Sequence, residues 1–484
     1  MKNSLLYPYK SLPGSLNQSL TDLHIEIIVN YLVPTQRKQG YVIDVLTRFE
    51  TNPEIITFRQ EVFKDVLKND KTVERLMRAF ENLEAINERY KTLKYQFGLF
   101  RGKFEIPLDV LNDSMNDFAL LILDLMDIYK KLDLIIETMD LSSKGFLAMK
   151  DYIESKTTNL SFNEMTKFFK EFINKSPYYE IGITGDDNML VQRVECLESF
   201  PKRPGMIKRN NSSEQVLFTA QSYAFFHTVY AYSRLNLYNV FENIFNQLFQ
   251  PLYNYQEEMP FIEFAIALAQ LSSSAYLKIC FPEITTNNEI RISSLYDLGL
   301  SVKAMKEEDR VVTVFPNDCI LDEKDAGRII MGANNSGKTV FLRSVGIAQV
   351  LFQAGLFICA TDATLAIRNQ LVTFLSSKEI HTKAGGRFEK EVYLVSKLID
   401  VIDNNSLILM NEIFQSTSLE AGVEALYDIL SFFTLKRTKW FVVTHLRSIT
   451  DCKANFIEET SQSFSVLKTR IEDGRYYIEE GIES

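Results

Sequence analysis

One stretch of the chain, GANNSGKT at 332–339, fits the phosphate-loop pattern G-x-x-x-x-G-K-[ST] without a mismatch. Its glycines let the backbone curl so that N–H groups point at phosphate oxygens, and the helix that follows adds its positive end. Lys338 is placed to reach the β- and γ-phosphates, and Thr339 to put its hydroxyl on Mg²⁺. The expected nucleotide-binding residues are Gly332, Ala333, Asn334, Asn335, Ser336, Gly337, Lys338, Thr339 and Val340. The alternative is a glycine-rich turn between a strand and a helix.

A second stretch, LILMNEIF at 407–414, could supply a metal contact and a catalytic carboxylate. Its first four residues are apolar and predict a buried parallel strand, which ends at Asn411 and Glu412. Glu412 is placed to polarise an attacking water, whereas Asn411 stands where an aspartate usually holds Mg²⁺ through water. An amide oxygen accepts a hydrogen bond but carries no charge. We therefore expect Thr339 and Asn411 to contact the metal, with weakened affinity and slow hydrolysis.

The segment after Glu412, FQSTSLEAG, combines hydroxyl side chains with the start of a helix. Thr417 and Glu420 have the spacing of a capping box, which predicts that the helix begins there. The helix N-terminus and the hydroxyls of Ser416, Thr417 and Ser418 would form an anion-binding surface. The alternative is a helix cap and nothing more.

His445 ends another apolar run, WFVVTHL at 440–446, which predicts a buried strand. A histidine at a strand end is often a core or capping residue. Because this one follows a phosphate loop and an acidic strand, we expect it to sense the γ-phosphate and count it, with Glu412, among the catalytic candidates.

The elements that must position these residues change in character near residue 285. Before it, helical patterns dominate and glycines are few; after it, short β-rich runs alternate with helical stretches, as in an α/β domain. We therefore expect a helical domain at 1–285 and an α/β phosphate-loop domain at 286–484. Glycine, proline and polar clusters predict an irregular insertion at 184–215. Long helices are expected at 54–90, 117–137 and 215–250.

Composition and charge exclude several classes of protein. The net charge of −10 means that a polyanion could be bound only through local basic patches. The five cysteines have no CxxC spacing, so neither a zinc site nor a disulfide framework is indicated. The most apolar segment, 118–136, carries charged residues that a membrane span would not tolerate well, and the N-terminus lacks the apolar core of a signal peptide. We expect a cytoplasmic protein that does not enter membranes.

Taken together, these segments resemble the ATPase domain of the MutS family of DNA mismatch-repair proteins, from about residue 290 to 484. FPNDCIL at 315–321 resembles the family's segment before the phosphate loop, which implies that Phe315 stacks on adenine. GRFEKE at 386–391 resembles the family segment that carries Phe and Glu three residues apart. The resemblance implies an ABC-like, MutS-type ATPase domain behind an α-helical core and lever domain. The helical region resembles the family more weakly, and the segments that carry this resemblance are 58–67 and 261–276.

The chain also departs from the family pattern. We expect it to begin in the helical core, without room for the mismatch-reading domain, and the DNA-gripping clamp to be at most the segment 184–215. At the C-terminus, 463–481 reads as a hairpin with an Asp-Gly turn, and the family's terminal helical dimerisation unit is expected to be missing.

The resemblance implies an ATPase that uses ATP and Mg²⁺ and works as a homodimer or heterodimer. Two subunits would meet head to tail, each offering Ser416–Ser418 to the other's γ-phosphate, and closure would change the grip on DNA during repair or recombination. The usual mismatch reading is not expected. One alternative is a nucleotide-gated protein-interaction module that does not bind DNA, and another is an inactive ATPase that binds ATP as a structural ligand.

Two basic stretches are candidates for contacts to DNA phosphates. The first contains Arg89, Lys91, Lys94, Arg101 and Lys103, interleaved with Tyr95, Phe97 and Phe100. The second contains Lys202, Arg203, Lys208 and Arg209. The alternative for both is a solvated helix face or loop.

Overall fold

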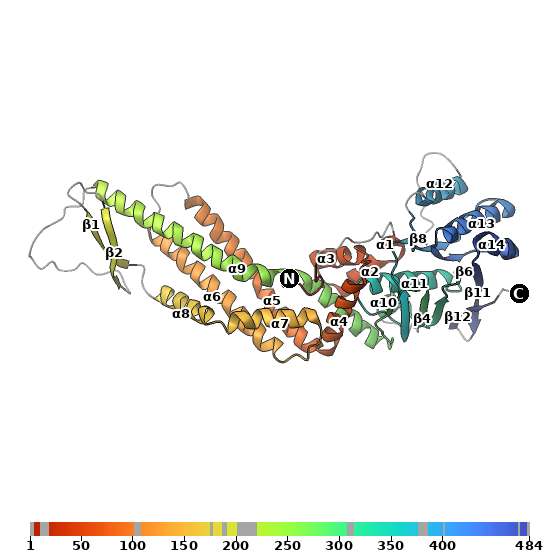
Figure 1. Ribbon diagram of the computed structural model, residues 1–484, viewed down its shortest axis with the longest axis horizontal. Coiled ribbons are helices and arrows are strands. Elements are labelled where there is room, and N and C mark those ends of the chain that lie inside the picture. The colour runs from red at the N-terminus through yellow and green to blue at the C-terminus, as the bar shows by residue number, and fades with distance from the viewer. Residues whose placement is uncertain are drawn as a thin grey trace, which may run out of the picture. The chain divides into compact units, whose positions relative to one another are not determined.

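Figure 1 shows the computed structural model, which describes residues 4–9, 19–100, 108–174, 178–185, 191–200, 220–306, 314–375, 386–399, 402–472 and 475–481. The chain divides into two compact units. The first comprises Met1–Lys68, Ser142–Gly145 and Glu258–Ser484, and the second comprises Asn69–Leu141 and Phe146–Glu257. A helical part followed by a mixed α/β part is observed, as expected. Residues 1–68 and 258–285, however, belong to the same unit as the α/β part. The two units therefore do not meet at a single boundary near residue 285.

The second unit consists mainly of long helices that pack through aromatic side chains. Its helices are α5 (Asp70–Phe100), α6 (Leu108–Ile136), most of α7 (Lys144–Thr157), α8 (Leu160–Asn174) and the first part of α9 (Ala220–Ser274). Tyr90 of α5 stacks on Phe245 of α9 with ring centroids 4.4 Å apart. Phe118 of α6 lies 6.1 Å from each of these two rings, so the three helices share one apolar core.

The helix expected over 54–90 is interrupted, because α4 (Pro53–Lys68) ends before Asn69 and α5 begins after it. The Asn69 side chain donates a hydrogen bond to Asp140 O at 2.9 Å and accepts one from Asp140 N at 3.0 Å. Asparagine side chains that bond to backbone in this way compete with a continuing helix. The helix expected at 117–137 corresponds to the part of α6 that ends at Ile136, and the described part of the segment 215–250, from Ala220 on, lies within α9.

Part of the segment expected to be irregular is a β-strand. Strands β1 (Tyr178–Gly185) and β2 (Val191–Phe200) pair antiparallel, with Tyr178 opposite Phe200. The prediction of an irregular insertion at 184–215 is therefore wrong for the residues in these strands. The run VQRVECLESF alternates apolar and polar residues only in part, and pairing with β1 supplies the backbone hydrogen bonds that the pattern alone did not predict. Residues 201–219 lie outside the described chain.

The main sheet of the first unit places several strand ends side by side. In the described chain its strands run in the order β12-β11-β6-β10-β9-β8. They are β6 (Asp325–Met331), β8 (Leu371–Phe374), β9 (Leu407–Asn411), β10 (Lys439–Val443), β11 (Ser463–Glu472) and β12 (Arg475–Glu480). Neighbouring strands are parallel except for β11 and β12, which form the expected hairpin. Its Asp-Gly turn lies outside the described residues.

Buried apolar strands explain the centre of this sheet. Every residue of β10 is buried, as are Leu407–Met410 of β9. Continuous apolar runs of this kind are typical of parallel strands covered on both faces. The covering helices and the 3-10 turn are α11 (Lys338–Gln353), α12 (Arg387–Ile399), α13 (Leu419–Leu435), η1 (Arg447–Cys452) and α14 (Lys453–Thr460).

A smaller sheet and a group of helices, most of them from the N-terminal part of the chain, complete the first unit. The smaller sheet has the order β3-β7-β4-β5, formed by β3 (Glu283–Thr285), β4 (Ile290–Leu295), β5 (Asn317–Leu321) and β7 (Asp362–Ala366). The helices are α1 (Ser19–Asp22), α2 (Ile25–Leu32), α3 (Gln36–Thr47), α4, the last part of α9 and α10 (Leu298–Lys306). Helix α2 contacts α10 and helix α3 contacts α11, which is why the beginning of the chain belongs to this unit. Among the described helices, none is long and apolar enough to cross a membrane.

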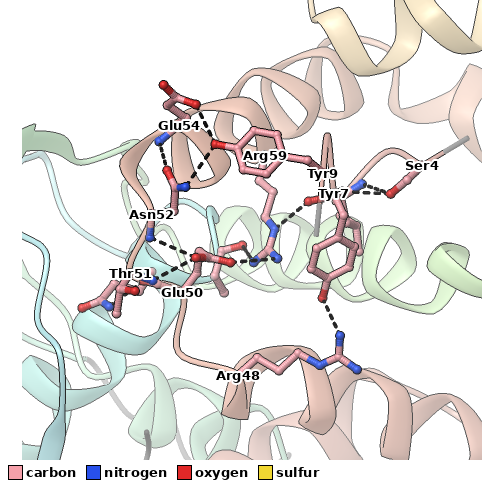
Figure 2. Close-up of polar contacts among 12 residues, drawn as sticks. Ser4, Tyr7, Tyr9, Arg48, Glu50, Thr51, Asn52, Glu54 and Arg59 are labelled. Atoms are coloured by element: carbon pink, nitrogen blue, oxygen red, sulfur yellow. Dashed lines mark hydrogen bonds and ion pairs between the residues drawn. The ribbon is translucent and has the colours of Figure 1, made fainter. Parts of the chain in front are cut away.

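The guanidinium of Arg59, on α4, lies at the centre of a buried network (Figure 2). Arg59 Nε donates to Leu6 O at 2.9 Å, and the guanidinium lies 4.6 Å from the centroid of the Tyr7 ring. Nη1 donates to Ala354 O at 3.5 Å, at the end of α11, and Nη2 is 3.8 Å from the Glu50 carboxylate. Arg59 therefore connects the N-terminal segment (residues 4–9) to the far end of the helix that follows the phosphate loop.

Glu258 holds the same N-terminal segment from the other side. Its carboxylate accepts hydrogen bonds from the Ser4 hydroxyl, from Leu5 N at 2.5 Å and from Leu6 N at 3.3 Å. Burial raises the pKa of Glu258 to about 7, although these hydrogen bonds and the charge of Arg59 act in the opposite direction. The folded protein therefore binds a proton at Glu258 more tightly than the unfolded chain does.

This pKa shift predicts that stability falls as the pH rises from 5 to 8. The contribution of protonated Glu258 is fully present below its ordinary pKa of 4.5 and is lost as the pH passes about 7. Over that interval the wild type should lose roughly 2–3 kcal/mol relative to Glu258→Gln in urea unfolding. The matched control is Glu54→Gln, at an exposed position that contacts Tyr9 of the same segment. Equal pH slopes for the wild type and Glu258→Gln would contradict the assignment.

Candidate functional site

The loop between β6 and α11 has the backbone curl that its sequence predicts. Gly332 has φ of 152° and Gly337 has φ of 87°, both in the region that favours glycine, and Asn335 between them has φ of 60°. A Cβ at Gly332 would lie 1.8 Å from the Thr469 hydroxyl, so the approach of β11 also requires glycine there. Thr469 donates to the Ser336 hydroxyl at 2.8 Å. The curl is thus supported by a neighbouring strand.

Lys338 folds back onto this loop. Its side chain is buried, and Nζ donates to Gly332 O and Ala333 O, each at 2.7 Å. The ammonium group is therefore held inside the ring of backbone that the loop forms, at the N-terminus of α11. That end of a helix carries partial positive charge, so charge and dipole both favour an anion here.

The start of helix α11 and the end of strand β9 bring Thr339 and Asn411 together. The Thr339 hydroxyl donates to Asn411 Oδ1 at 3.1 Å. The amide oxygen of Asn411 thus faces the residue that we expect to hold a metal. Two neutral oxygens are suitable ligands for Mg²⁺, which prefers oxygen, but they bring no negative charge.

Glu412 and His445 form a pair at the same edge of the sheet. His445 Nε2 lies 3.2 Å from Glu412 Oε1, and both side chains are more than a third exposed. Glu412 N donates to Val443 O at 2.9 Å, and Glu412 has φ of 55°. A glutamate in this left-handed conformation is uncommon, and such backbone strain is concentrated at functional sites.

Helix α12 supports the loop that follows Glu412. Glu391 Oε2 accepts a hydrogen bond from Phe414 N at 2.8 Å, and the rings of Phe388 and Phe414 meet edge to face with centroids 5.8 Å apart. Phe414 also has positive φ, 62°. The sequence pointed to Phe388 and Glu391 only through a family resemblance, whereas the structure shows the atoms that they hold.

A pocket of about 860 Å³ lies beside the phosphate loop. It is lined by Leu295, Asp297, Leu300, Val314, Phe315, Asn317, Asn334, Asn335, Ser336, Gly337, Lys338, Thr339, Val340, Phe341, Ser344, Asn411, Glu412, Tyr476 and Ile478. Phe315, most of the loop and the end of β9 therefore meet in one cavity. Gly332, Ala333, His445 and Ser416–Ser418 do not line it.

The β11–β12 hairpin supplies a wall of this pocket that sequence reasoning missed. A Cβ at Gly337 would lie 3.7 Å from Tyr476 Cβ, and the Arg475 guanidinium lies 5.3 Å from the Phe315 ring centroid. Asn317 fixes the hairpin, since its Nδ2 donates to Tyr476 O at 3.2 Å and its Oδ1 accepts from Ile478 N at 2.8 Å. The sequence signal was only a pair of tyrosines in a hairpin, far along the chain from the loop.

The helix after Glu412 is capped differently from the prediction. Ser418 is the N-cap of α13, and its hydroxyl accepts from Ala421 N at 3.4 Å. The predicted capping box of Thr417 and Glu420 is wrong, because the helix begins one residue later, at Leu419. Ser416 and Ser418 are exposed and do not line this chain's own pocket.

The first basic stretch is ion-paired where the structure describes it. Arg89 lies 2.6 Å from Asp124, Lys91 2.7 Å from Glu88, and Lys94 3.1 Å from Glu242. Phe97 is buried and Tyr95 is exposed. The side chains of Phe100, Arg101 and Lys103, and the whole second stretch (Lys202, Arg203, Lys208, Arg209), lie outside the described residues. These pairs fit the interpretation as a solvated helix face.

The segment that forms most of this site is similar in sequence to known proteins. Residues 328–479 match the family model described as MutS domain V. The DNA mismatch repair protein MutS of Petrotoga mobilis is 30% identical over 185 residues, which cover 36% of this chain and 23% of that protein. The MutS of Finegoldia magna is 23% identical over 342 residues, 66% of this chain and 36% of that protein. Endonuclease MutS2 of Lactobacillus acidophilus is 21% identical over 350 residues, 70% of this chain and 43% of that protein.

In each case the matched part spans less than half the length of the relative. The matched domain model contains the phosphate loop, the strand that ends at Asn411 and Glu412, and His445. Residues 328–479 of this chain therefore form a MutS domain V.

Proposed function

We propose that this chain binds ATP with Mg²⁺ and hydrolyses it slowly, and that hydrolysis resets a dimer whose closure is coupled to DNA binding in repair or recombination. The observation that carries the proposal is the pocket that joins the phosphate loop, Asn411, Glu412 and Phe315. The groups that we propose for phosphate binding, metal binding and water activation thereby lie together. We also propose an ABC-like, MutS-type arrangement for this phosphate-loop domain, which the strand order supports.

The phosphate groups would be bound by the loop and by Lys338. The curled backbone between Gly332 and Gly337 presents N–H groups, and the N-terminus of α11 adds a favourable dipole. Lys338 is already held at the loop by two carbonyl oxygens, so little side-chain entropy remains to be lost when phosphate binds. Phe315 and Tyr476 both line the pocket and would offer aromatic faces for the base.

Thr339 and Asn411 fit a magnesium site through their oxygens, which lie 3.1 Å apart. When bound, Mg²⁺ would neutralise charge on the phosphates. Because Asn411 lacks the charge of an aspartate, it holds a cation more weakly. The expected result is an intact site that requires more Mg²⁺.

Glu412 would orient the water that attacks the γ-phosphorus and accept its proton, while the bond to the β-phosphate oxygen breaks and ADP leaves with inorganic phosphate. His445, 3.2 Å from Glu412, would fix the carboxylate and sense the γ-phosphate. The hydroxyls of Ser416, Thr417 and Ser418 would act on a partner's nucleotide, because Ser416 and Ser418 are exposed outside this chain's pocket at the start of α13. The partner subunit would be identical or different.

The role in DNA metabolism rests on the relatives, which are named as mismatch repair proteins and an endonuclease. A second candidate is a nucleotide-gated protein-interaction module that does not bind DNA. Two observations favour it, the net charge of −10 and the ion-paired state of Arg89, Lys91 and Lys94.

Hydrolysis is tested by a steady-state ATPase assay on the wild type and on Glu412→Gln. We expect kcat to fall about 100-fold or more, because the carboxylate that accepts the proton is lost. ATP binding should remain, since glutamine keeps the shape of the side chain. Glu424→Gln, an exposed position on α13, is the matched control and should keep wild-type kcat. Equal hydrolysis rates in the wild type and Glu412→Gln would contradict the catalytic role of Glu412, and no hydrolysis by either would leave a nucleotide-binding protein without catalysis.

The role of Asn411 is tested by titrating Mg²⁺ in the same assay. Asn411→Asp should lower the half-saturating Mg²⁺ concentration about tenfold, because a negative charge is added beside the Thr339 hydroxyl. Asn404→Asp adds the same charge in an exposed turn before the opposite end of β9 and should leave the titration unchanged. An unchanged Mg²⁺ requirement in Asn411→Asp would show that this amide does not limit metal binding.

DNA binding is tested by fluorescence anisotropy with duplex, junction and looped DNA at low and moderate salt. If phosphates are contacted, affinity should fall about tenfold or more between roughly 50 and 200 mM salt. The second candidate predicts no binding to any of these DNAs, together with protein partners that are retained after nuclease treatment. The two results separate the candidates.

A further inference from the structure

Asp297 lies on the wall of the pocket at the junction of β4 and α10. Its side chain is 5% exposed. Oδ1 accepts a hydrogen bond from Leu300 N at 2.5 Å, and its backbone carbonyl accepts from the Ser301 hydroxyl at 2.8 Å. Asp297 is thus the N-cap of α10, a role that needs only one carboxylate oxygen.

The second oxygen of Asp297 has no such explanation. Oδ2 is buried and, within the described residues, has no hydrogen-bond partner. Burial raises the pKa of Asp297 to about 6, an effect that the N–H groups of Leu300 and Gly299 and the charge of Arg343 only partly offset. Buried polar oxygens in folded proteins are nearly always hydrogen-bonded, because leaving one unpaired costs free energy. An N-cap alone would be achieved more cheaply by serine.

The surroundings of Asp297 indicate which part of a ligand it would meet. Leu295, Leu300 and Phe341 line the pocket together with Asp297, and so do the polar residues Ser344 and Asn317, the second of which pairs with Leu295 in the β4–β5 ladder. The Asn317 amide is already hydrogen-bonded to the hairpin. The Ser344 hydroxyl already donates to Phe341 O at 2.8 Å. Ser344 lies six positions after Lys338 on α11, which corresponds to about 9 Å along the helix axis. Asp297 lies near this part of α11, since α10 contacts α11 and the charge of Arg343 acts on Asp297. The phosphate loop and Asp297 are therefore separate parts of the lining of one cavity.

An apolar wall with one acceptor suits a purine better than a sugar. An aromatic base has faces that pack on apolar side chains and an edge that carries polar groups. A ribose would present adjacent hydroxyl groups, which require several polar partners. The exocyclic amino group of adenine is a hydrogen-bond donor that complements a carboxylate oxygen.

We propose that Asp297 Oδ2 accepts a hydrogen bond from the exocyclic amino group of the bound nucleotide's base, so that Asp297 selects a 6-aminopurine. The inference rests on the proposed function, because it places a nucleotide in this pocket. It adds a specificity-determining residue that the motifs of the sequence do not include. A base without the amino group leaves Oδ2 unpaired, which is the situation that binding sites reject most strongly.

The test compares ATP with purine riboside triphosphate, which carries hydrogen in place of the amino group, by competition against a fluorescent ATP analogue. The wild type should bind ATP about 10-fold or more tightly, the usual range for a hydrogen bond to a charged group. Asp297→Asn and Asp297→Ser both keep an oxygen that caps α10 and lose the free acceptor. In both variants the two nucleotides should bind within about twofold of each other, with the loss confined to ATP.

Asp318→Asn is the matched control. Asp318 is an exposed carboxylate on β5 whose Oδ1 accepts from Ser294 N at 2.8 Å, outside the pocket lining. This variant should keep the wild-type ratio. If the wild type binds ATP and purine riboside triphosphate with equal affinity, the inference is wrong. It is also wrong if Asp297→Asn and Asp297→Ser keep the wild-type ratio of the two affinities.

A contact between Asp297 and the sugar is distinguished by two deoxynucleotides. If Asp297→Ser abolishes discrimination against 2′-deoxy- or 3′-deoxy-ATP but not against purine riboside triphosphate, the acceptor serves the sugar and the inference is wrong. Lys338→Ala tests the proposed function independently, because it should weaken both nucleotides equally. If binding depends on Lys338 but ATP and purine riboside triphosphate bind equally well, the role of Asp297 is wrong and the proposed function stands. If the wild type binds neither nucleotide, the proposed function and the role of Asp297 are both wrong.

Discussion

The buried guanidinium of Arg59 is the interaction on which the arrangement of the first unit depends. It joins Leu6 and Tyr7 of the N-terminal segment, Glu50 before α4 and the carbonyl of Ala354 at the end of α11. A buried charge is tolerated only when its partners are in place, so α4, which carries Arg59, and these three segments must be assembled together. Because α11 begins at the phosphate loop, the first residues of the chain help to fix a helix whose other end forms the candidate site. Gly355 allows this approach, since a Cβ there would lie 2.3 Å from Arg59 Cβ.

The same unit shows how the candidate site concentrates charge at one edge of a sheet. Parallel strands β6, β9 and β10 end side by side, which brings the loop, Asn411 and the region of His445 together. The Glu412–His445 contact is local and depends on a left-handed backbone at Glu412. Glu391 of α12 holds the next turn through Phe414 N. Asn411 brings no charge to this edge, and its amide oxygen accepts a hydrogen bond from Thr339.

Part of the pocket lining comes from segments of the chain that carry no recognisable motif. Tyr476 arrives on the terminal hairpin and is fixed by Asn317, and Asp297 arrives at the start of α10. A phosphate loop needs one particular backbone conformation, so its residues recur at a fixed spacing that can be recognised in the sequence. The groups that would meet a base need only a suitable position in space, which different segments can supply. Motif reading therefore identifies the phosphate end of such a site better than its base end.

Local chemistry accounts for the features that could be predicted correctly from the residues alone: the helical and α/β parts, the strand–loop–helix around Lys338, the apolar strand that ends at Asn411, and the terminal hairpin. These features follow from apolar periodicity and from glycines with positive φ, which act over a few residues. The tertiary structure alone decided that residues 1–68 join the α/β unit, that Asn69 interrupts a helix, and that Ser418 rather than Thr417 caps α13. It alone brought Asp297 and Tyr476 to the pocket and His445 to Glu412. The physical reason is that these outcomes depend on contacts between segments distant in the chain, whose energies leave no regular pattern in the sequence.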